Sequence, residues 1–235
     1  MKSRYSFSGI EAASGLLDQM LASDAAKALA DERTAPRRFF DRLVHEGLLT
    51  DALQVLPHLL PKPVAVWWGY LCVWEAYRPE PPPKVAAVLE AVWRWLAAPT
   101  EANRRALEEP MDAAGHGTAA GCLAAAACWS GGSMSRPGLP DVLPPPHLTA
   151  RFLAATALLT AAARQPHRCV ERHAELLGLG LQVARGQLLF PGLVPAQERP
   201  MVAAAERETA DRLHAALAGA LSASGHSLSP ELAMK

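Results

Sequence analysis

The sequence predicts an all-α protein: an antiparallel multi-helix bundle or a short helix-hairpin array, with an appended C-terminal amphipathic helix. Half of its 235 residues are hydrophobic, and alanine and leucine, both strong helix formers, are prominent among them. β-branched residues never alternate with polar residues over the length of a strand, so we expect no sheet. Proline and glycine separate one apolar segment from the next, as is typical of successive short helices.

The most informative segment is the apolar run from Val64 to Trp74. It contains three of the six tryptophans and almost no polar residue. A bilayer takes about 20 apolar residues to cross, so this run is too short to span one. Pro63 precedes the run and Pro79 follows it. We therefore expect a helix that is buried on nearly all sides and forms the centre of a helical domain.

The other helices follow from apolar spacing and from the positions of proline, glycine and capping residues. The predicted helices cover residues 9–31, 36–45, 50–60, 64–77, 84–98, 100–109, 118–129, 149–164, 166–185 and 201–221. Thr100 is a suitable N-cap for its helix, and Pro110 is expected to end that helix. The helix over 118–129 consists almost entirely of small residues, which allow close packing, so we expect it to be central as well.

Composition divides the chain into five parts. We expect an N-terminal helical extension over 1–34, a helical core domain over 35–186 and a Gly/Pro-rich linker over 187–200. An amphipathic helix over 201–221 and a serine-rich, disordered tail over 222–235 complete the chain.

Charge and cysteine content bear on the partners and the compartment. Basic and acidic residues number 23 each, which argues against nucleic acid or an acidic membrane as the main partner. No apolar run is long enough to span a membrane, and residues 5–15, which follow the mildly basic N-terminus, lack the apolar segment of a signal peptide. The four cysteines lie in separate apolar segments and are expected to be free thiols. We therefore expect a cytoplasmic protein. The arginine pair Arg104 and Arg105 is expected on a solvated helix face.

A long irregular segment, residues 130–147, is the candidate partner-docking loop. Its candidate residues are Ser130, Gly131, Gly132, Ser133, Pro144, Pro145, Pro146 and His147. Loops of this length are uncommon and often functional, and a proline triplet holds an extended conformation at low entropy cost. A packed structural loop is the more ordinary interpretation of the same residues. Trp93 is the candidate exposed aromatic contact, because its neighbour Trp95 points from another face of the helix.

No residue pattern predicts a catalytic, cofactor or metal site. Cys169 and His173, near His167, could chelate an ion from one helix face, but the chain lacks the spacing motifs of zinc sites. Burial of Cys72 would raise the pKa of its thiol, so it is not expected to be a nucleophile. Glu75 is expected to pair with the arginine three residues later. We expect no cofactor and no metal ion.

Three segments resemble a family of uncharacterised bacterial helical proteins. They are residues 53–72, residues 129–150 from Trp-Ser-Gly-Gly-Ser through the proline triplet, and residues 180–186. The resemblance covers about residues 35–186. Members of the family often look associated with type VI secretion gene clusters. The resemblance implies no enzymatic activity and supplies no catalytic residues.

These observations lead us to expect a non-enzymatic cytoplasmic interaction or adaptor protein with a protein partner. The resemblance implies an accessory factor of a type VI secretion system. One alternative is an effector or toxin enzyme, which would need a pocket lined by polar residues such as Glu75, His116 or His147. Another is a structural homo-oligomer that associates through the helix over 201–221.

Overall fold

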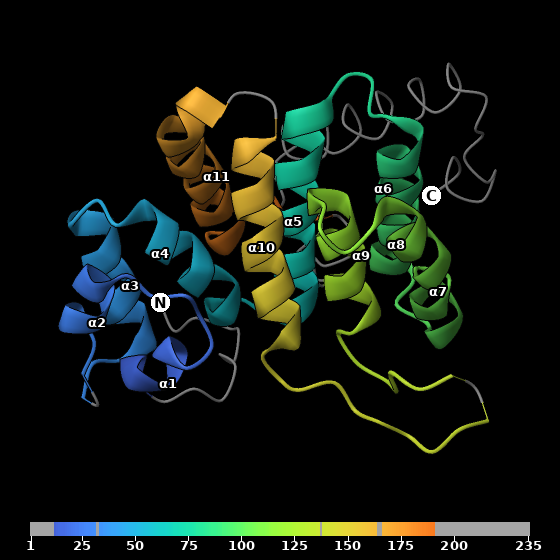
Figure 1. The fold of residues 1–235 in the computed structure, drawn as a ribbon, viewed down its shortest axis with the longest axis horizontal. Helices are drawn as coiled ribbons and strands as arrows, with labels where there is room; N and C mark the ends of the chain where they lie inside the picture. The colour runs from blue at the N-terminus through green and yellow to red at the C-terminus, as the bar shows by residue number, and fades with distance from the viewer. Residues whose placement is uncertain (1–11, 32, 137, 164–165, 191–235) are drawn as a thin grey trace.

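The computed structural model describes residues 12–31, 33–136, 138–163 and 166–190, and within these ranges the chain is helical with no strand (Figure 1). The helices are α1 (Ala13–Leu17), α2 (Asp24–Leu29), α3 (Pro36–His45), α4 (Leu49–Val55), α5 (Lys62–Tyr77), α6 (Pro83–Ala97), α7 (Glu101–Arg105), α8 (Glu108–Ala114), α9 (Ala119–Cys128), α10 (Leu148–Ala162) and α11 (Cys169–Ala184). Short 3-10 helices occupy Leu56–Leu59 (η1) and Pro166–Arg168 (η2).

The predicted all-α bundle is confirmed. The predicted helix over 201–221 and tail over 222–235 lie outside the described residues, as do most of the linker and the first part of the N-terminal extension.

Helix α5 is the buried centre of the bundle. Every residue from Val64 to Trp74 is buried, and α5 packs against α6, α9, α10 and α11. Pro63 lies in the first turn, where a missing N–H costs no hydrogen bond. A helix without a polar face is stable in water only when other elements cover it all round. The prediction of a fully buried tryptophan helix is therefore confirmed.

Two tryptophan indoles connect α5 to the C-terminal part of the described chain. Trp68 Nε1 donates to the carbonyl oxygen of Leu176 on α11 at 3.0 Å. Trp67 Nε1 donates to the carbonyl oxygen of Leu188, beyond the end of α11, at 2.7 Å. An acceptor offsets the cost of burying an indole N–H, so these two bonds favour the observed position of α11 and of the segment after it on α5.

Small residues allow the central helices to approach closely. All residues of α9, Ala119–Cys128, are buried, and α9 packs against both α5 and α10. A β-carbon on Gly69 of α5 would lie 2.5 Å from Leu153 Cδ2 of α10. Thr118 caps α9 by accepting a hydrogen bond from the amide of Gly121 at 3.0 Å. The small-residue helix is thus central, as predicted.

The predicted helix over 9–31 is wrong in its continuity, because within its described residues the chain forms α1 and α2 with a break between them. Side chains of α4 hold the break. Asp51 accepts hydrogen bonds from the amide and the hydroxyl of Ser23, both at 2.9 Å, and Gln54 accepts from the amide of Leu21 at 2.8 Å. Ser23 then caps α2. Tertiary hydrogen bonds override helix propensity here.

The prediction of one helix over 100–109 is also wrong. Thr100 does cap a helix, accepting from the amide of Asn103 at 3.2 Å, but that helix, α7, ends at Arg105. A second helix, α8, then begins at Glu108 and continues past Pro110. Proline fits the first turn because amides there have no partner within the helix, so Pro110 lies inside α8 rather than ending a helix.

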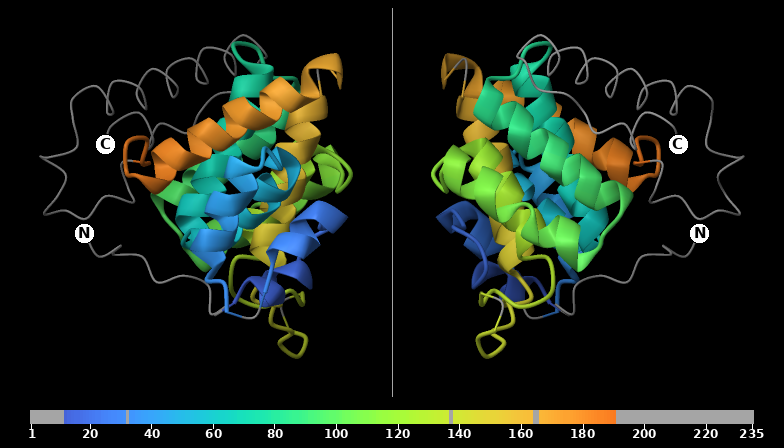
Figure 2. Two further views of the ribbon diagram at one scale, coloured as in Figure 1. Left: turned by 90° about the vertical axis from the view of Figure 1, so that its left-hand side faces the viewer. Right: turned by 90° about the vertical axis from the view of Figure 1, so that its right-hand side faces the viewer.

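Among the described residues, one segment projects from the end of the bundle. In Figure 1, α1–α4 lie on one side of α5, α9 and α10, and α6–α8 lie on the other. The α9–α10 connection, residues 130–147, extends away from the helices, as both views of Figure 2 also show. In the described ranges, no helix combines the length and the apolarity that crossing a membrane requires.

The close packing of α11 on α5 can be tested by replacing two glycines of α11, one at the contact and one away from it. A β-carbon on Gly180 would clash with Leu56 Cδ2 and lie 2.8 Å from Trp68 Nε1, whereas one on Gly178 would meet nothing within 4 Å. We predict that Gly180→Ala lowers the free energy of unfolding by about 1–3 kcal/mol. Gly178→Ala should raise it by about 0.4–1 kcal/mol, because alanine restricts the unfolded chain. Urea denaturation measures both, and a stabilised Gly180→Ala protein would contradict the packing.

Candidate functional site

The projecting loop, residues 130–147, is fixed where it leaves α9. Lys62 Nζ, at the start of α5, donates to the carbonyl oxygen of Ser130 at 2.8 Å. Ser130 Oγ in turn donates to the carbonyl oxygen of Ala127 at 2.8 Å. Partial burial lowers the pKa of Lys62. The first residue of the loop is therefore tied to two helices.

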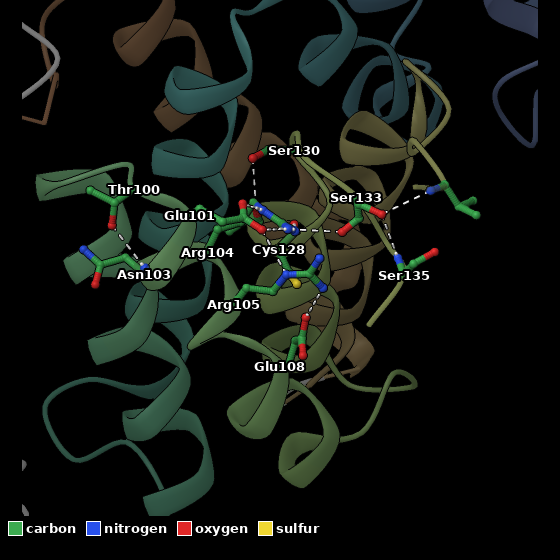
Figure 3. A network of polar contacts seen from close by, with 12 residues as sticks. Thr100, Glu101, Asn103, Arg104, Arg105, Glu108, Cys128, Ser130, Ser133 and Ser135 are labelled. Carbon is green, nitrogen blue, oxygen red and sulfur yellow. Dashed lines mark hydrogen bonds and ion pairs between the residues drawn. The ribbon is translucent and has the colours of Figure 1, made fainter. Parts of the chain in front are cut away.

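A buried arginine of α7 forms the main anchor of the loop (Figure 3). The side chain of Arg104 is only 5% exposed. Its Nη1 donates to the carbonyl oxygen of Cys128 at 2.5 Å and its Nη2 to that of Ser133 at 3.1 Å. Nε and Nη2 also form a two-pronged ion pair with Glu101, at 2.7 and 2.6 Å. One guanidinium thus joins α7, the end of α9 and the loop.

The ion pairs of this anchor extend to the protein surface. The hydrogen bond from Arg104, and next that from Arg105, hold the pKa of Glu101 well below its ordinary value, at about 2. Arg105 also donates to Glu108 at 2.7 Å. Glu101 therefore stays charged at neutral pH and keeps the guanidinium of Arg104 oriented toward the two backbone carbonyls. The prediction that Arg104 lies on a solvated helix face is wrong, because its side chain is buried.

Gly132 is required by the geometry of the anchor. Its φ of +64° lies in the region that favours glycine. A β-carbon there would also lie 2.8 Å from Arg104 Nε. A side chain at this position would therefore meet both backbone strain and the arginine that holds the loop.

The loop then folds back on itself. Ser133 Oγ accepts from the amides of Ser135 and Val142, both at 3.1 Å. The amide of Met134 donates to the carbonyl oxygen of Val142 at 2.8 Å. Near the far end, the amide of Leu148 donates to the carbonyl oxygen of Pro145 at 3.0 Å. These bonds give the described part of the loop a defined shape between its two ends.

The projecting part of the loop carries apolar side chains in contact with water. Leu139 is 61% exposed, Val142 56% and Leu143 73%. Arg136 and Asp141, of opposite charge, are exposed beside them. Single exposed apolar side chains are ordinary, but three within five residues on an anchored loop form a candidate contact surface. We call Leu139, Val142 and Leu143 the apolar tip.

The residues that sequence analysis selected lie at the base of the loop rather than at the apolar tip. Most of them are half-buried, namely Ser130, Gly131, Ser133, Pro144 and His147. The others, Gly132, Pro145 and Pro146, are exposed. The glycine, serine and proline patterns that drew attention to the loop mark its anchors and turns. The signal that was overlooked is the occurrence of two leucines and a valine close together among the prolines of the segment.

The expectation that Trp93 is exposed is wrong. Its side chain is 8% exposed and packs against Trp67, Tyr70 and Phe190, with ring centroids 6.1, 5.9 and 4.8 Å away. Phe190 comes from the segment after α11, which sequence analysis treated as the beginning of a linker. That segment, together with α5, covers the face of α6 on which Trp93 lies.

The other candidate groups do not assemble into a site in the described residues. Cys169 Sγ lies 3.4 Å from His173 Nε2, and His173 Nδ1 lies 3.2 Å from Thr50 Oγ1, while His167 is exposed. No cluster of three or more potential metal-ligating side chains is found among them.

Two predictions about single polar side chains are confirmed. Burial raises the pKa of the Cys72 thiol. Glu75 forms the expected ion pair with Arg78, at 3.0 Å.

A buried histidine lies close to the end of the loop. His58 of η1 is 3% exposed. Burial, and then electrostatic interaction with His147 and Arg151, lower the pKa of His58 to about 4. His58 is therefore neutral at pH 7, and acid would place a charge inside the bundle where α10 begins.

Comparison with known families adds one result. Residues 39–184 match the model of a family of unknown function, DUF6931. The chain belongs to the DUF6931 family. No curated protein and no solved structure matches it. The DUF6931 segment runs from α3 to the end of α11, so it contains the loop and its anchor but not α1, α2 or the residues after α11. An uncharacterised family is what the resemblance predicted, over nearly the same residues.

The anchor can be tested by removing its charge. We predict that Arg104→Met lowers the free energy of unfolding by about 2–3 kcal/mol, because two backbone carbonyls lose a charged donor. Amide exchange at Met134 and Val142 should also accelerate. Arg105→Met is the matched control, since its ion pairs lie at the surface and contribute little. Equal effects of the two variants on loop exchange would show that Arg104 does not hold the loop.

The lowered pKa of His58 leads us to predict that the free energy of unfolding falls in acid. Its folded-state pKa of about 4 lies below that of an unfolded histidine, about 6.5. The unfolded state therefore binds more protons between these values, and stability is lost as the pH falls through that window, by about 3 kcal/mol at most. We predict that His58→Gln removes this part of the pH dependence, measured by urea denaturation at several pH values. His45→Gln, which changes an exposed histidine, should keep the wild-type slope.

Proposed function

We propose that this DUF6931 protein is a non-enzymatic interaction or adaptor protein that docks on a partner protein through the 130–147 loop. The observation that carries the proposal is the apolar tip. Leu139, Val142 and Leu143 are exposed on a loop whose base is held by Arg104 and Lys62. Apolar side chains that are exposed in the free protein gain most when a partner covers them.

The anchoring favours binding over a purely structural role. A loop that is ordered before binding loses little conformational entropy on binding, so more of the contact energy appears as affinity. Proline on both sides of the tip restricts the backbone further. The contact area of one loop is small, so the complex is expected to belong to the weak or transient class. A hydrophobic groove on the partner is the complementary surface.

The nature of the partner follows from the family resemblance seen in the sequence. Such proteins look associated with type VI secretion gene clusters. On this basis we propose that the partner is a component of a type VI secretion system and that this protein is an accessory factor. All four cysteines are free thiols, which is typical of reducing compartments, and we propose the cytoplasm as the site of action.

The experiment is affinity purification from the source bacterium at low salt, with mass spectrometry of the proteins that co-purify. We predict that wild-type protein captures a recurrent partner and that the double variant Leu139→Ser, Leu143→Ser captures at least about ten-fold less of it, a loss of about 1.4 kcal/mol or more. Leu21→Ser is the matched control, because Leu21 is 88% exposed and lies outside the loop. Surface changes of this kind should leave folding stability nearly unchanged.

Two outcomes would contradict the proposal. Undiminished capture by the double variant would exclude the apolar tip as the docking surface. A wild-type protein that captures nothing recurrent, even after chemical cross-linking in the cells before lysis has trapped weak complexes, would contradict the proposal and favour the enzyme or homo-oligomer alternatives.

A further inference from the structure

A short segment beyond α11 lies against the centre of the bundle. We call residues 185–190 the strap. Trp67 Nε1 donates to the carbonyl oxygen of Leu188 in the strap at 2.7 Å. The ring of Phe190 packs edge-on against Trp67 and Trp93, with centroid distances of 5.3 and 4.8 Å. Phe190 is 3% exposed, so its side chain is almost fully enclosed.

The surface that receives the strap is built by α5 and α6. Trp67 and Tyr70 stack with ring centroids 5.1 Å apart, and Trp93 lies 5.9 Å from Tyr70. We call Trp67, Tyr70 and Trp93 the aromatic groove. It offers the rings of Trp67 and Trp93 to the side chain of Phe190 and one indole N–H to a backbone carbonyl. Among the described residues, the buried hydroxyl of Tyr70 has no hydrogen-bond partner.

The contact has the chemistry of peptide recognition. Binding of an extended peptide commonly combines hydrogen bonds to its backbone, which any sequence can make, with a pocket that selects one side chain. The aromatic groove supplies both to Leu188 and Phe190. Gln187 is the last strap residue whose amide donates to a described backbone carbonyl, that of Gln182, at 2.9 Å. Beyond it the strap is held by the groove rather than by helical hydrogen bonds.

The extent of the family places the groove and the strap in different parts of the chain. The DUF6931 match over 39–184 includes Trp67, Tyr70 and Trp93 and ends before the strap. The groove therefore lies inside the matched segment, and the strap that covers it lies outside.

We propose that the aromatic groove is a peptide-binding site, occupied in cis by the strap and able to accept in trans an extended segment of a partner protein. The partner segment presents a Leu-x-Phe pattern like Leu188 to Phe190: a backbone carbonyl for the Trp67 indole and, two residues later, an aromatic ring. The strap acts as a built-in competitor. This site is separate from the apolar tip, and neither proposal depends on the other.

The test uses full-length protein and a labelled peptide with the sequence Gly-Gln-Leu-Leu-Phe, residues 186–190, with blocked ends. Phe190→Ala empties the aromatic pocket while keeping the chain complete. We predict that this variant binds the peptide at least about ten-fold more tightly than wild type does, measured by fluorescence anisotropy. The peptide Gly-Gln-Leu-Leu-Ala should not bind. Phe152→Ala is the control protein, because Phe152 packs against Trp129, outside the groove, and it should bind like wild type.

Equal peptide affinities of the Phe190→Ala protein and wild type, or no binding to either, would overturn the proposal. A second measurement needs no variant. Hydrogen exchange on wild-type protein should show the indole N–H of Trp67, which donates to the strap, exchanging at least about a hundred-fold faster than the indole N–H of Trp68, which donates to α11, because the strap opens without the bundle. Exchange of the two indoles at the same rate would show that the strap is an integral part of the core, and this too would overturn the proposal.

Discussion

The structure depends on the burial of one helix that has no polar face. Because α5 is apolar all round, water is excluded only when α6, α9, α10 and α11 all cover it. Its two adjacent indoles, Trp67 and Trp68, donate to the carbonyls of Leu188 and Leu176, which offsets the cost of burying their N–H groups. These two effects favour the observed position of α11 and of the segment that follows it.

The same constraint positions both proposed binding surfaces. Small side chains let α9 pack tightly on α5 and α10, so α9 ends at a fixed place beside α7. Arg104 can therefore bind the last carbonyl of α9 and the first part of the loop together. Trp67 and Tyr70 of α5 meet Trp93 of α6 and create the aromatic groove. Both surfaces are consequences of how the central helix is covered.

Local patterns in the sequence predicted the local features well. Helix class, the buried tryptophan helix, the Thr100 cap and the Glu75–Arg78 pair depend on residues close in the chain. Features that depend on distant residues were not predictable in this way. Arg104 resembles a surface arginine until the carbonyls of Cys128 and Ser133 are placed beside it. The break near Ser23 depends on Asp51, and the burial of Trp93 depends on Phe190. In the loop, the prolines and glycines of the sequence marked the anchors, whereas the apolar tip could be recognised only from the exposed fractions of its side chains in the structure.

Native-state hydrogen exchange of the α5 amides, in increasing concentrations of denaturant, tests most directly whether the bundle depends on this helix. We predict that the amides from Val66 to Val73 exchange only through global unfolding, so that their exchange free energy equals the unfolding free energy from urea denaturation. Exchange of these amides through a lower-energy opening, while α9 and α10 stay protected, would contradict a fold organised around α5.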